Sequence, residues 1–440
     1  MSFPRYPAYK PSGVEWLGEV PEHWEVLPLK REFAVVGGST PRSDTQDYWD
    51  GDIQWITPAD LSRLQSFEIT ESIRTITADG LNSCGATMVP IGSVVVSTRA
   101  PIGSLGIAGI ELCTNQGCKA LVPNDQISPS FTAYFLGIAT EALNVRGRGA
   151  TFLEISGDEL GAFKVALPPY QEQVQIAKFL DRETAKIDTL IAEQQRLIEL
   201  MQEKRQAVIS HAVTKGLNPK APMKDSGVEW LGKVPDHWEV LPCRAFLNER
   251  DERNNDYRSD YYLSLVAGRG VIPYDEKGDI GNKKPEDLGK CKHVREGDFV
   301  INSMNYGIGS YGVSRYDGVC SPVYIVVTPI EARTRPGFAF RVLENKWFQQ
   351  YAQSFGNGIL AHRCAIGWDV LKNIKAGLPP ENEQLDILRY LDEQTSRFES
   401  LIAEAEKQVN LLKERRSALI SAAVTGQIDV RGLVTEANPA

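Results

Sequence analysis

The chain has 440 residues, of which 42% are hydrophobic and 24% are charged, and its formal net charge is −9 at pH 7. This length and composition indicate a folded protein of two to four domains. They exclude a disordered chain and a bundle of membrane spans, because no apolar run approaches ~20 residues. The acidic balance argues against a protein that grips DNA unaided, because basic side chains make most phosphate contacts.

The chain opens on a polar segment, Met1 to Gly13, which lacks the apolar core of a signal peptide. Its seven cysteines are scattered and form no spacing typical of a zinc site. We therefore expect a cytoplasmic protein with free thiols, no metal and no membrane contact.

A segment near the N-terminus is repeated in the middle of the chain. Residues 12–28 read SGVEWLGEVPEHWEVLP, and residues 226–242 read SGVEWLGKVPDHWEVLP. Only two of these 17 positions differ, which indicates that the chain contains two copies of one unit. His23 and Trp24 recur with the repeat, and we expect them to be packing residues.

The stretches that follow these openings, residues 29–160 and 243–370, share little sequence. Both are rich in β-branched residues, glycine and turn formers, and strands are expected at 93–97, 299–301 and 323–327. We interpret them as two variable domains set into a repeated scaffold. A faint common skeleton survives, with Gly92, Gly103, Ser104 and Gly106 spaced much like Gly297, Gly309, Ser310 and Gly312.

A second repeated motif follows each variable domain and predicts a long helix. Leu167-Pro168-Pro169 with Glu172-Gln173 recurs as Leu378-Pro379-Pro380 with Glu383-Gln384. About 45 residues without proline or glycine follow each Pro-Pro pair, so the pair is expected to open a helix that Gly216 or Gly426 ends. Such a helix is about 65 Å long, roughly two turns of B-DNA.

Residues in these two helices recur at alternating steps of three and four, the 3.5-residue period of a coiled-coil seam. The alternative is a pair of amphipathic helices packed on separate cores. Arg205 and Arg416 occupy seam positions, where they could fix the register, bind a partner or extend past the seam to solvent; we favour the last. The predicted seam residues are Leu180, Ile187, Ile191, Ile198 and Met201 in the first helix, and Leu391, Phe398, Ile402, Val409 and Leu412 in the second.

Motifs of enzymes that act on DNA are incomplete in this sequence. An amino-methyltransferase needs Asn or Asp before Pro-Pro-Tyr to hold the target amine, but Leu167 stands there. Lys284 replaces the first glycine of a phosphate loop that would end at Gly289-Lys290, and the five histidines show no metal spacing. We therefore predict that the chain has no catalytic residues and is not an enzyme.

The repeated segments resemble the specificity subunits of type I restriction–modification enzymes, and the resemblance spans nearly the whole chain. Its motifs are the two Ser-Gly-Val-Glu-Trp-Leu-Gly openings, the two helix starts and the ending Ala423 to Asp429. Within the first variable domain, residues 38–41, 55–61 and 97–103 also look familial.

This resemblance implies an α+β fold with an internal two-fold pseudo-repeat. Two globular target-recognition domains would be separated and followed by long helices that form an antiparallel coiled coil. The expected boundaries are 1–167 for the N-terminal recognition domain, 168–215 for the central helix, 216–378 for the C-terminal recognition domain, 379–425 for the last helix and 426–440 for a tail.

The resemblance also implies partners. Each recognition domain would read one half of a split, asymmetric site in double-stranded DNA, and the helices would dock two modification (methyltransferase) subunits. Two restriction (motor/nuclease) subunits would join them, and S-adenosylmethionine, ATP and magnesium would belong to these partners. The alternative is a coiled-coil adaptor that presents two protein- or ligand-binding domains and does not bind DNA.

Candidate DNA contacts are polar and basic side chains in the variable domains, because Arg, Asn, Gln, Ser and Thr read base edges while Arg and Lys bind phosphates. A solvated surface loop is the alternative for residues 146–149. The candidates are Thr40, Arg42, Thr57, Ser97, Thr98, Arg99, Asn115, Gln116, Arg146 and Arg148 in the first domain, and Arg269, Asn302, Ser303, Asn305, Tyr306, Ser310, His362 and Arg363 in the second.

Overall fold

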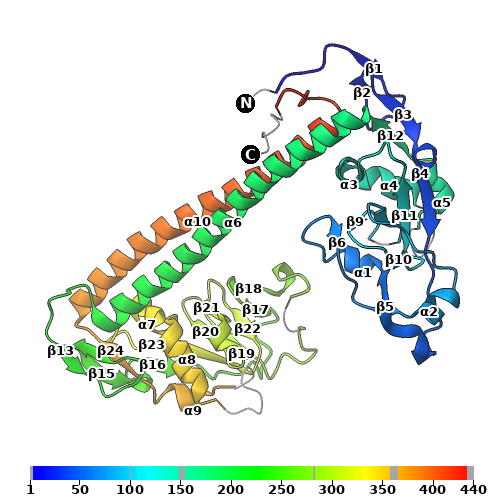
Figure 1. Ribbon diagram of the computed structural model, residues 1–440. Coiled ribbons are helices and arrows are strands. Elements are labelled where there is room, and N and C mark those ends of the chain that lie inside the picture. Colours follow the sequence, from blue (N-terminus) through cyan, green and yellow to red (C-terminus); the bar gives the residue numbers. More distant parts are fainter. Residues whose placement is uncertain (1–2, 100, 148–153, 281–282, 357–364, 434–440) are drawn as a thin grey trace. The chain divides into compact units, whose positions relative to one another are not determined.

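The computed structural model describes residues 3–99, 101–147, 154–280, 283–356 and 365–433. These residues form two compact units, the first made of 1–194 with 407–440 and the second of 195–406. Each unit mixes strands and helices (Figure 1), which confirms the predicted α+β class. Among the described residues, none of the helices combines the length and the apolar character needed to span a membrane.

The first unit is built on a five-stranded sheet in the order β4-β11-β8-β9-β6. Its middle strand β8 reads Val-Val-Val-Ser and is fully buried, as suits β-branched residues in a strand covered on both faces. The strands are β4 (Phe33–Gly37), β6 (Glu68–Ile69), β8 (Val94–Ser97), β9 (Leu105–Ala108) and β11 (Cys118–Pro123).

A smaller sheet in the order β10-β5-β7 and several short helices complete the variable part of this unit. The strands are β5 (Trp49–Ile56), β7 (Thr75–Ile76) and β10 (Cys113–Thr114); the helices are α1 (Pro58–Leu61), α2 (Ala78–Asn82), α3 (Pro129–Ile138), α4 (Thr140–Arg146) and α5 (Gly157–Gly161).

The second unit repeats the strand order of the first. Its four-stranded sheet runs β16-β23-β20-β21, which corresponds to β4-β11-β8-β9. Gly103 and Gly309, which precede β9 and β21, have φ of 94° and 88°, a region that favours glycine. The sparse glycine pattern therefore marks a shared topology. The strands are β16 (Leu247–Glu249), β20 (Phe299–Asn302), β21 (Tyr311–Val313) and β23 (Tyr324–Pro329).

Further elements of the second unit are two strand pairs and three helices among the described residues. They are β17 (Leu263–Val266) with β18 (Gly270–Pro273), β19 (Lys292–Val294) with β22 (Gly318–Cys320), α7 (Pro336–Leu343), α8 (Lys346–Ser354) and α9 (Trp368–Leu371).

The repeated opening segment forms the same scaffold in both units. An antiparallel pair comes first, β1 (Tyr9–Pro11) with β2 (Glu19–Pro21) and β13 (Met223–Asp225) with β14 (Lys233–Pro235). The next strand pairs with the one that leads into the long helix: β3 (Glu25–Pro28) with β12 (Lys164–Leu167), and β15 (Glu239–Pro242) with β24 (Lys375–Leu378).

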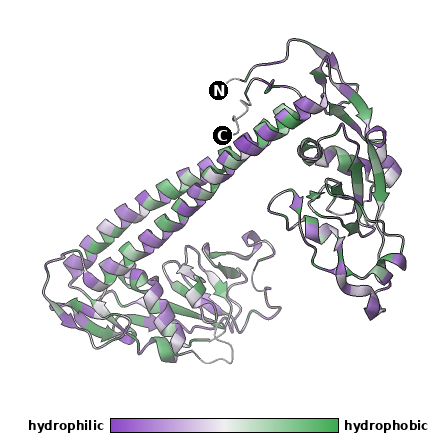
Figure 2. Cartoon of the chain, in the orientation of Figure 1, coloured by the Kyte–Doolittle hydropathy of each residue, from purple (hydrophilic) through white to green (hydrophobic). Residues whose placement is uncertain are grey.

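Two long helices, α6 (Tyr170–Lys215) and α10 (Glu381–Val424), run antiparallel. In the first unit, Leu180 and Ile187 share a core with Leu419 and Ala423; in the second, Ile209 and Ala212 share a core with Ile387 and Leu391. Hydrophobic and hydrophilic residues alternate along both helices (Figure 2). The shared cores confirm the predicted antiparallel pairing. Of the predicted seam residues, Leu180, Ile187, Leu391 and Val409 are buried, and Ile191, Ile198, Met201, Phe398, Ile402 and Leu412 are half-buried.

The two seam arginines are partly exposed, Arg205 at 31% and Arg416 at 38%, and each also faces an acid on the other long helix. Arg416 donates from Nε and Nη2 to the Asp188 carboxylate at 2.8 and 3.2 Å. Arg205 approaches Glu399, with Nη1 and Oε1 3.7 Å apart. In each unit, therefore, an arginine on one long helix faces an acid on the other, which favours a role in fixing the antiparallel register.

Candidate nucleic-acid interface

In the first unit, four loops meet where β4, β5, β8 and β10 end. Backbone hydrogen bonds join them: Ser39 N–H donates to the Thr114 carbonyl at 3.0 Å, and Asn115 N–H donates to the Ile56 carbonyl at 2.9 Å. Thr98 N–H donates to the Gly117 carbonyl at 2.8 Å. The loops that carry most of the predicted contacts of this domain are thus held together at one end of its sheets.

A buried acid fixes the loop after β5. The Asp60 carboxylate accepts hydrogen bonds from the backbone N–H and the hydroxyl of Thr57, at 2.8 and 2.5 Å, and from the Ile73 N–H at 2.6 Å. This arrangement is a capping box at the start of α1. Thr57 is half-buried, and its hydroxyl and N–H stabilise the conformation of its own loop.

Arg99 is the partly exposed cation of this loop cluster. Its Nε lies 3.1 Å from Glu154 Oε2, and both side chains are about 40% exposed, at 43% and 40%. An ion pair this open is weak and can be exchanged for a phosphate or a base edge. Arg42 Nε lies 3.6 Å from Asp44 Oδ1, and the Arg42 side chain is more exposed than that of Arg99. Thr40 donates its hydroxyl hydrogen to the Gln116 side chain.

Other predicted residues of the first unit have their polar groups engaged inside it. Ser97 and Thr98 are fully buried, and their hydroxyls donate to the carbonyls of Pro101 and Gly117. Asn115 Oδ1 accepts from the Gly117 N–H. Arg146 lies at the end of α4 with its guanidinium over the Phe163 ring. Its Nη1 lies 3.9 Å from Glu159 Oε2. Arg148 lies outside the described residues.

The corresponding place in the second unit is the loop between β20 and β21, residues 303–310, which lies beside the β17–β18 turn (Figure 1). Gly268 N–H of that turn donates to the Gly309 carbonyl at 3.4 Å. Arg269 is exposed and donates to the Glu276 carbonyl, and Asn305 is exposed.

The remaining second-unit candidates are buried or not described. Tyr306 has no exposed surface, and its hydroxyl donates to the Leu343 carbonyl at 2.5 Å, so it anchors the loop. Burial also raises its pKa well above the usual tyrosine value. Asn302, Ser303 and Ser310 are buried as well, and His362 and Arg363 lie outside the described residues.

Sequence reasoning missed Lys119, a basic residue near the same loops. It lies on β11 opposite Gly37, and its Nζ is 3.4 Å from where a Cβ on Gly37 would lie. A Cβ at position 37 would be in ordinary contact with this lysine. Because Lys119 lies within a strand, loop composition gave no signal for it.

The repeated helix-start motif organises the scaffold. The Glu172 carboxylate accepts from the Tyr6 hydroxyl at 2.6 Å and from Trp24 Nε1 at 3.0 Å, and it lies 2.8 Å from His23 Nε2. Burial and this carboxylate raise the Tyr6 pKa far above its usual value, so the phenol stays protonated as a donor.

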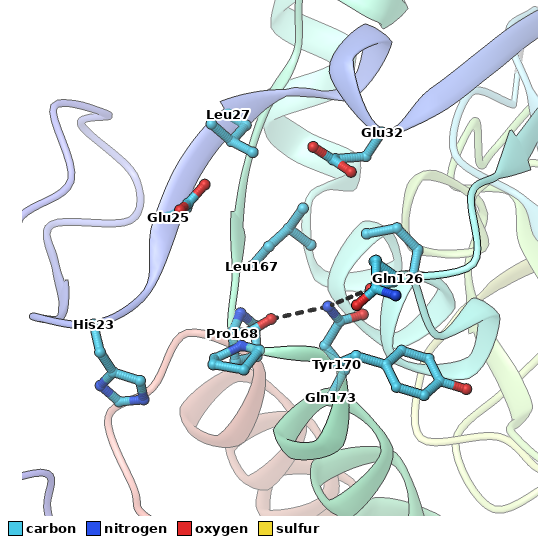
Figure 3. Close-up of a pocket in the computed structure, with 11 residues that line it drawn as sticks. His23, Glu25, Leu27, Glu32, Gln126, Leu167, Pro168, Tyr170 and Gln173 are labelled. Atoms are coloured by element: carbon cyan, nitrogen blue, oxygen red, sulfur yellow. Dashed lines mark hydrogen bonds between the residues drawn. The ribbon is translucent and has the colours of Figure 1, made fainter.

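Gln173 of the same motif joins the helix start to the chain before α3. Its side-chain amide donates to the carbonyls of Gln126 and Pro168 (Figure 3). Its side-chain oxygen accepts from the Ser128 N–H. Gln384 makes the matching bonds in the second unit, to the Pro379 carbonyl and from the Arg335 N–H. In the first unit, a pocket of about 210 Å³ is lined by Gln173, Gln126 and Pro168 together with residues of β3, among others.

The cysteine thiols, which could act as nucleophiles, are mostly buried in the core. Burial raises the pKa of the Cys113 thiol to about 12 and also raises those of Cys118, Cys243 and Cys320, which disfavours the thiolate needed for nucleophilic attack. Within the described ranges, no group of three or more His, Cys, Asp or Glu side chains is placed to hold a metal ion.

Sequence comparison finds relatives with a defined role. Residues 21–200 match the family described as the type I restriction modification DNA specificity domain. The MjaIX specificity subunit of Methanocaldococcus jannaschii is 33% identical over 42% of this chain and 43% of its own length. The EcoR124I/EcoR124II specificity subunit of Escherichia coli is 24% identical over 44% and 47%. The chain thus spans less than half the length of these two relatives.

A longer alignment joins the chain to the MjaVIII specificity subunit of Methanocaldococcus jannaschii, 22% identical over 94% of this chain and 95% of that one. Two solved structures share the fold at 15% identity. A chain described under complex assembly and conformational transition of the type I R-M system has a TM-score of 0.67 over 92% of this chain and 98% of its own. The HsdS subunit from Thermoanaerobacter tengcongensis has a TM-score of 0.51 over 93% and 98%.

Proposed function

Because the chain belongs to the family of type I restriction enzyme specificity subunits, we propose that it reads a two-part DNA site for a restriction–modification complex, one half with each unit. The observation that carries this proposal is the pair of matching loops after β8 and β20. Ser97 N–H donates to the Ser104 carbonyl in the first unit, and Asn302 N–H donates to the Ser310 carbonyl in the second.

These equivalent loops differ in the side chains that they expose, which is what two readers of different half-sites require. Arg99 is available in the first unit, with Arg42, Thr40 and Gln116 on neighbouring loops. Asn305 and Arg269 are available in the second. The adaptor alternative gives no reason for polar side chains able to read bases to lie at the same place in both units.

The sharpest test exchanges one variable domain. Replacing residues 243–370 with the same domain of a relative should change one half of the methylated site and leave the other half unchanged, because the loops after β8 lie in the first unit. Mapping methylated bases in cells that carry the complete system measures this. The reciprocal exchange of residues 29–160 is the control and should change only the other half. Changes in both halves, or in neither, would contradict independent reading.

We also propose that α6 and α10 dock the modification subunits through leucines outside the seam. Leu190 and Leu411 of the first unit are 45% and 47% exposed; Leu200 and Leu401 of the second are 45% and 47% exposed. Leu190 and Leu200 become Leu401 and Leu411 when 211 is added to their numbers, so each unit carries one copy of the same pair. Two equivalent pairs favour two modification subunits, with the restriction subunits joining that assembly.

Leu411→Asp should leave the chain folded, because the side chain is already half in water, and should remove one modification subunit. Burying a leucine at an interface stabilises it by ~1.5–3 kcal/mol, and a carboxylate there adds a desolvation cost. Native mass spectrometry of the purified complex counts the subunits. Val145→Asp, at a valine of the first unit that is 87% exposed, is the matched control and should keep both. Two bound subunits in the Leu411 variant would refute this docking surface.

The proposed roles of the subunits also assign the cofactors to the partners of this chain. We propose that S-adenosylmethionine is bound by the modification subunits, and ATP and magnesium by the restriction subunits. The chain itself supplies sequence recognition and no catalytic group, so its acidic net charge is compatible with the role: basic partner surfaces can bind the phosphates.

A further inference from the structure

The loop between β20 and β21 presents an apolar side chain that the first unit hides. Ile308 is 73% exposed, whereas Ile102, which also immediately precedes the positive-φ glycine, is 5% exposed and belongs to the core of the first unit. Met304, one turn earlier, is 47% exposed. The two variable domains therefore differ in what the same loop offers to a ligand.

The loop that carries Ile308 is rigidly held. Tyr306 anchors it in the core, and the Gly307 N–H donates to Gln353 Oε1 at 2.7 Å. Gln353 Nε2 in turn donates to the Met304 carbonyl, and the Ser310 N–H donates to the Asn305 carbonyl at 3.1 Å. Since each end and the middle are fixed, the exposure of Ile308 is a property of the fold and does not depend on a moving segment.

Asn305 lies three residues before Ile308 and is exposed. In the described part of the chain, its side-chain amide makes no hydrogen bond, while its backbone carbonyl accepts from Ile308 and Ser310. Arg269, on the adjoining turn, is also exposed. An apolar side chain between an unpaired amide and an exposed guanidinium, which donates only to the Glu276 carbonyl, matches a base-pair edge better than it matches a flat apolar protein surface.

We propose that Asn305 and Ile308 together read one A·T base pair in the major groove, with Ile308 against the thymine methyl group. This inference rests on the proposed function and names a specificity determinant within it. An asparagine amide pairs with N6 and N7 of adenine, and the methyl of the partner thymine projects into the same groove. Ile308 supplies the apolar contact that this methyl needs.

The test measures affinity of the assembled complex for its own site, as defined by methylation mapping, with each thymine replaced singly by deoxyuridine. Deoxyuridine keeps every hydrogen-bonding group and lacks only the methyl. One such replacement should weaken binding about fourfold, the effect of burying one methyl-sized group. It should lie in the half-site that changes when residues 243–370 are exchanged. Ile308→Ser should bind the normal site about fourfold more weakly and should no longer distinguish thymine from deoxyuridine at that position.

Two controls keep the outcome unambiguous. Val323→Ser changes another exposed β-branched residue of the second unit, 47% exposed, and should keep full discrimination. Asn305→Ala should lose discrimination between adenine and 7-deazaadenine, which lacks N7, at the paired base. An Ile308→Ser complex that still distinguishes thymine from deoxyuridine, or a wild-type complex indifferent to every replacement, overturns this inference while leaving DNA reading intact. A wild-type complex that does not prefer its own site overturns the proposed function itself.

Discussion

Leu391→Asp is expected to abolish the folded state of the second unit. Leu391 has no exposed surface and lies in the core with Ile209, Ala212 and Ile387. Removing a buried leucine side chain costs ~2–5 kcal/mol, and burying an unpaired carboxylate costs several more. Because domains are commonly stable by only ~5–15 kcal/mol, the sum removes most or all of this margin. Soluble yield and amide hydrogen exchange in β20 and β23 report the loss.

Two variants separate the buried charge from other effects. Leu401→Asp changes the same residue type on the same helix, but Leu401 is 47% exposed, so normal exchange protection is expected. Leu391→Ala removes the side chain without adding charge and should cost ~2–5 kcal/mol in chemical denaturation. Wild-type protection in Leu391→Asp would mean that this position does not face the core.

The helices could be predicted in detail because their determinants are local. A Pro-Pro start, about 45 residues without a breaker and a 3.5-residue period fix both the helix and its buried side, without any knowledge of the rest of the fold. The partner of each arginine could not be predicted, since Asp188 and Glu399 become neighbours only after the antiparallel register is known. For that reason we expected Arg205 and Arg416 only to reach solvent, and their acidic partners were not foreseen.

The candidate contacts illustrate a different limit. Residue type identified side chains that are able to read DNA, but it does not reveal which side of a strand or turn they occupy. Ser97, Thr98 and Tyr306 meet the chemical criterion, yet their hydroxyls satisfy carbonyls inside the fold. In compact loops, buried backbone groups must be paired, so nearby hydroxyls are often used for that purpose. Ile308 was missed for the opposite reason, because an apolar residue is expected to be buried.

The second large effect is expected at Glu172. Glu172→Ala should destabilise the first unit by about 3–5 kcal/mol, because it leaves the Tyr6 hydroxyl and the Trp24 indole N–H buried without an acceptor. Tyr6 is 4% exposed and Trp24 has no exposed surface, so water cannot easily replace the carboxylate. Hydrogen exchange of the β8 and β11 amides, measured at several denaturant concentrations, gives the loss in free energy of unfolding for the first unit alone.

The second repeat offers a matched control at the same motif position. Glu383 contacts His237 at 2.6 Å, but the Trp238 indole N–H has no hydrogen-bond partner among the residues that the structure describes, and the position equivalent to Tyr6 is occupied by Lys220. The His237 side chain is 48% exposed, so Glu383→Ala should cost no more than about 1 kcal/mol, read from β20 and β23 amides. Tyr6→Phe, which removes one donor and keeps the carboxylate, should fall between the two at about 1–1.5 kcal/mol. If the two glutamate substitutions cost the same, the donors Tyr6 and Trp24 contribute nothing through Glu172, and the identical motif performs the same structural task in both units.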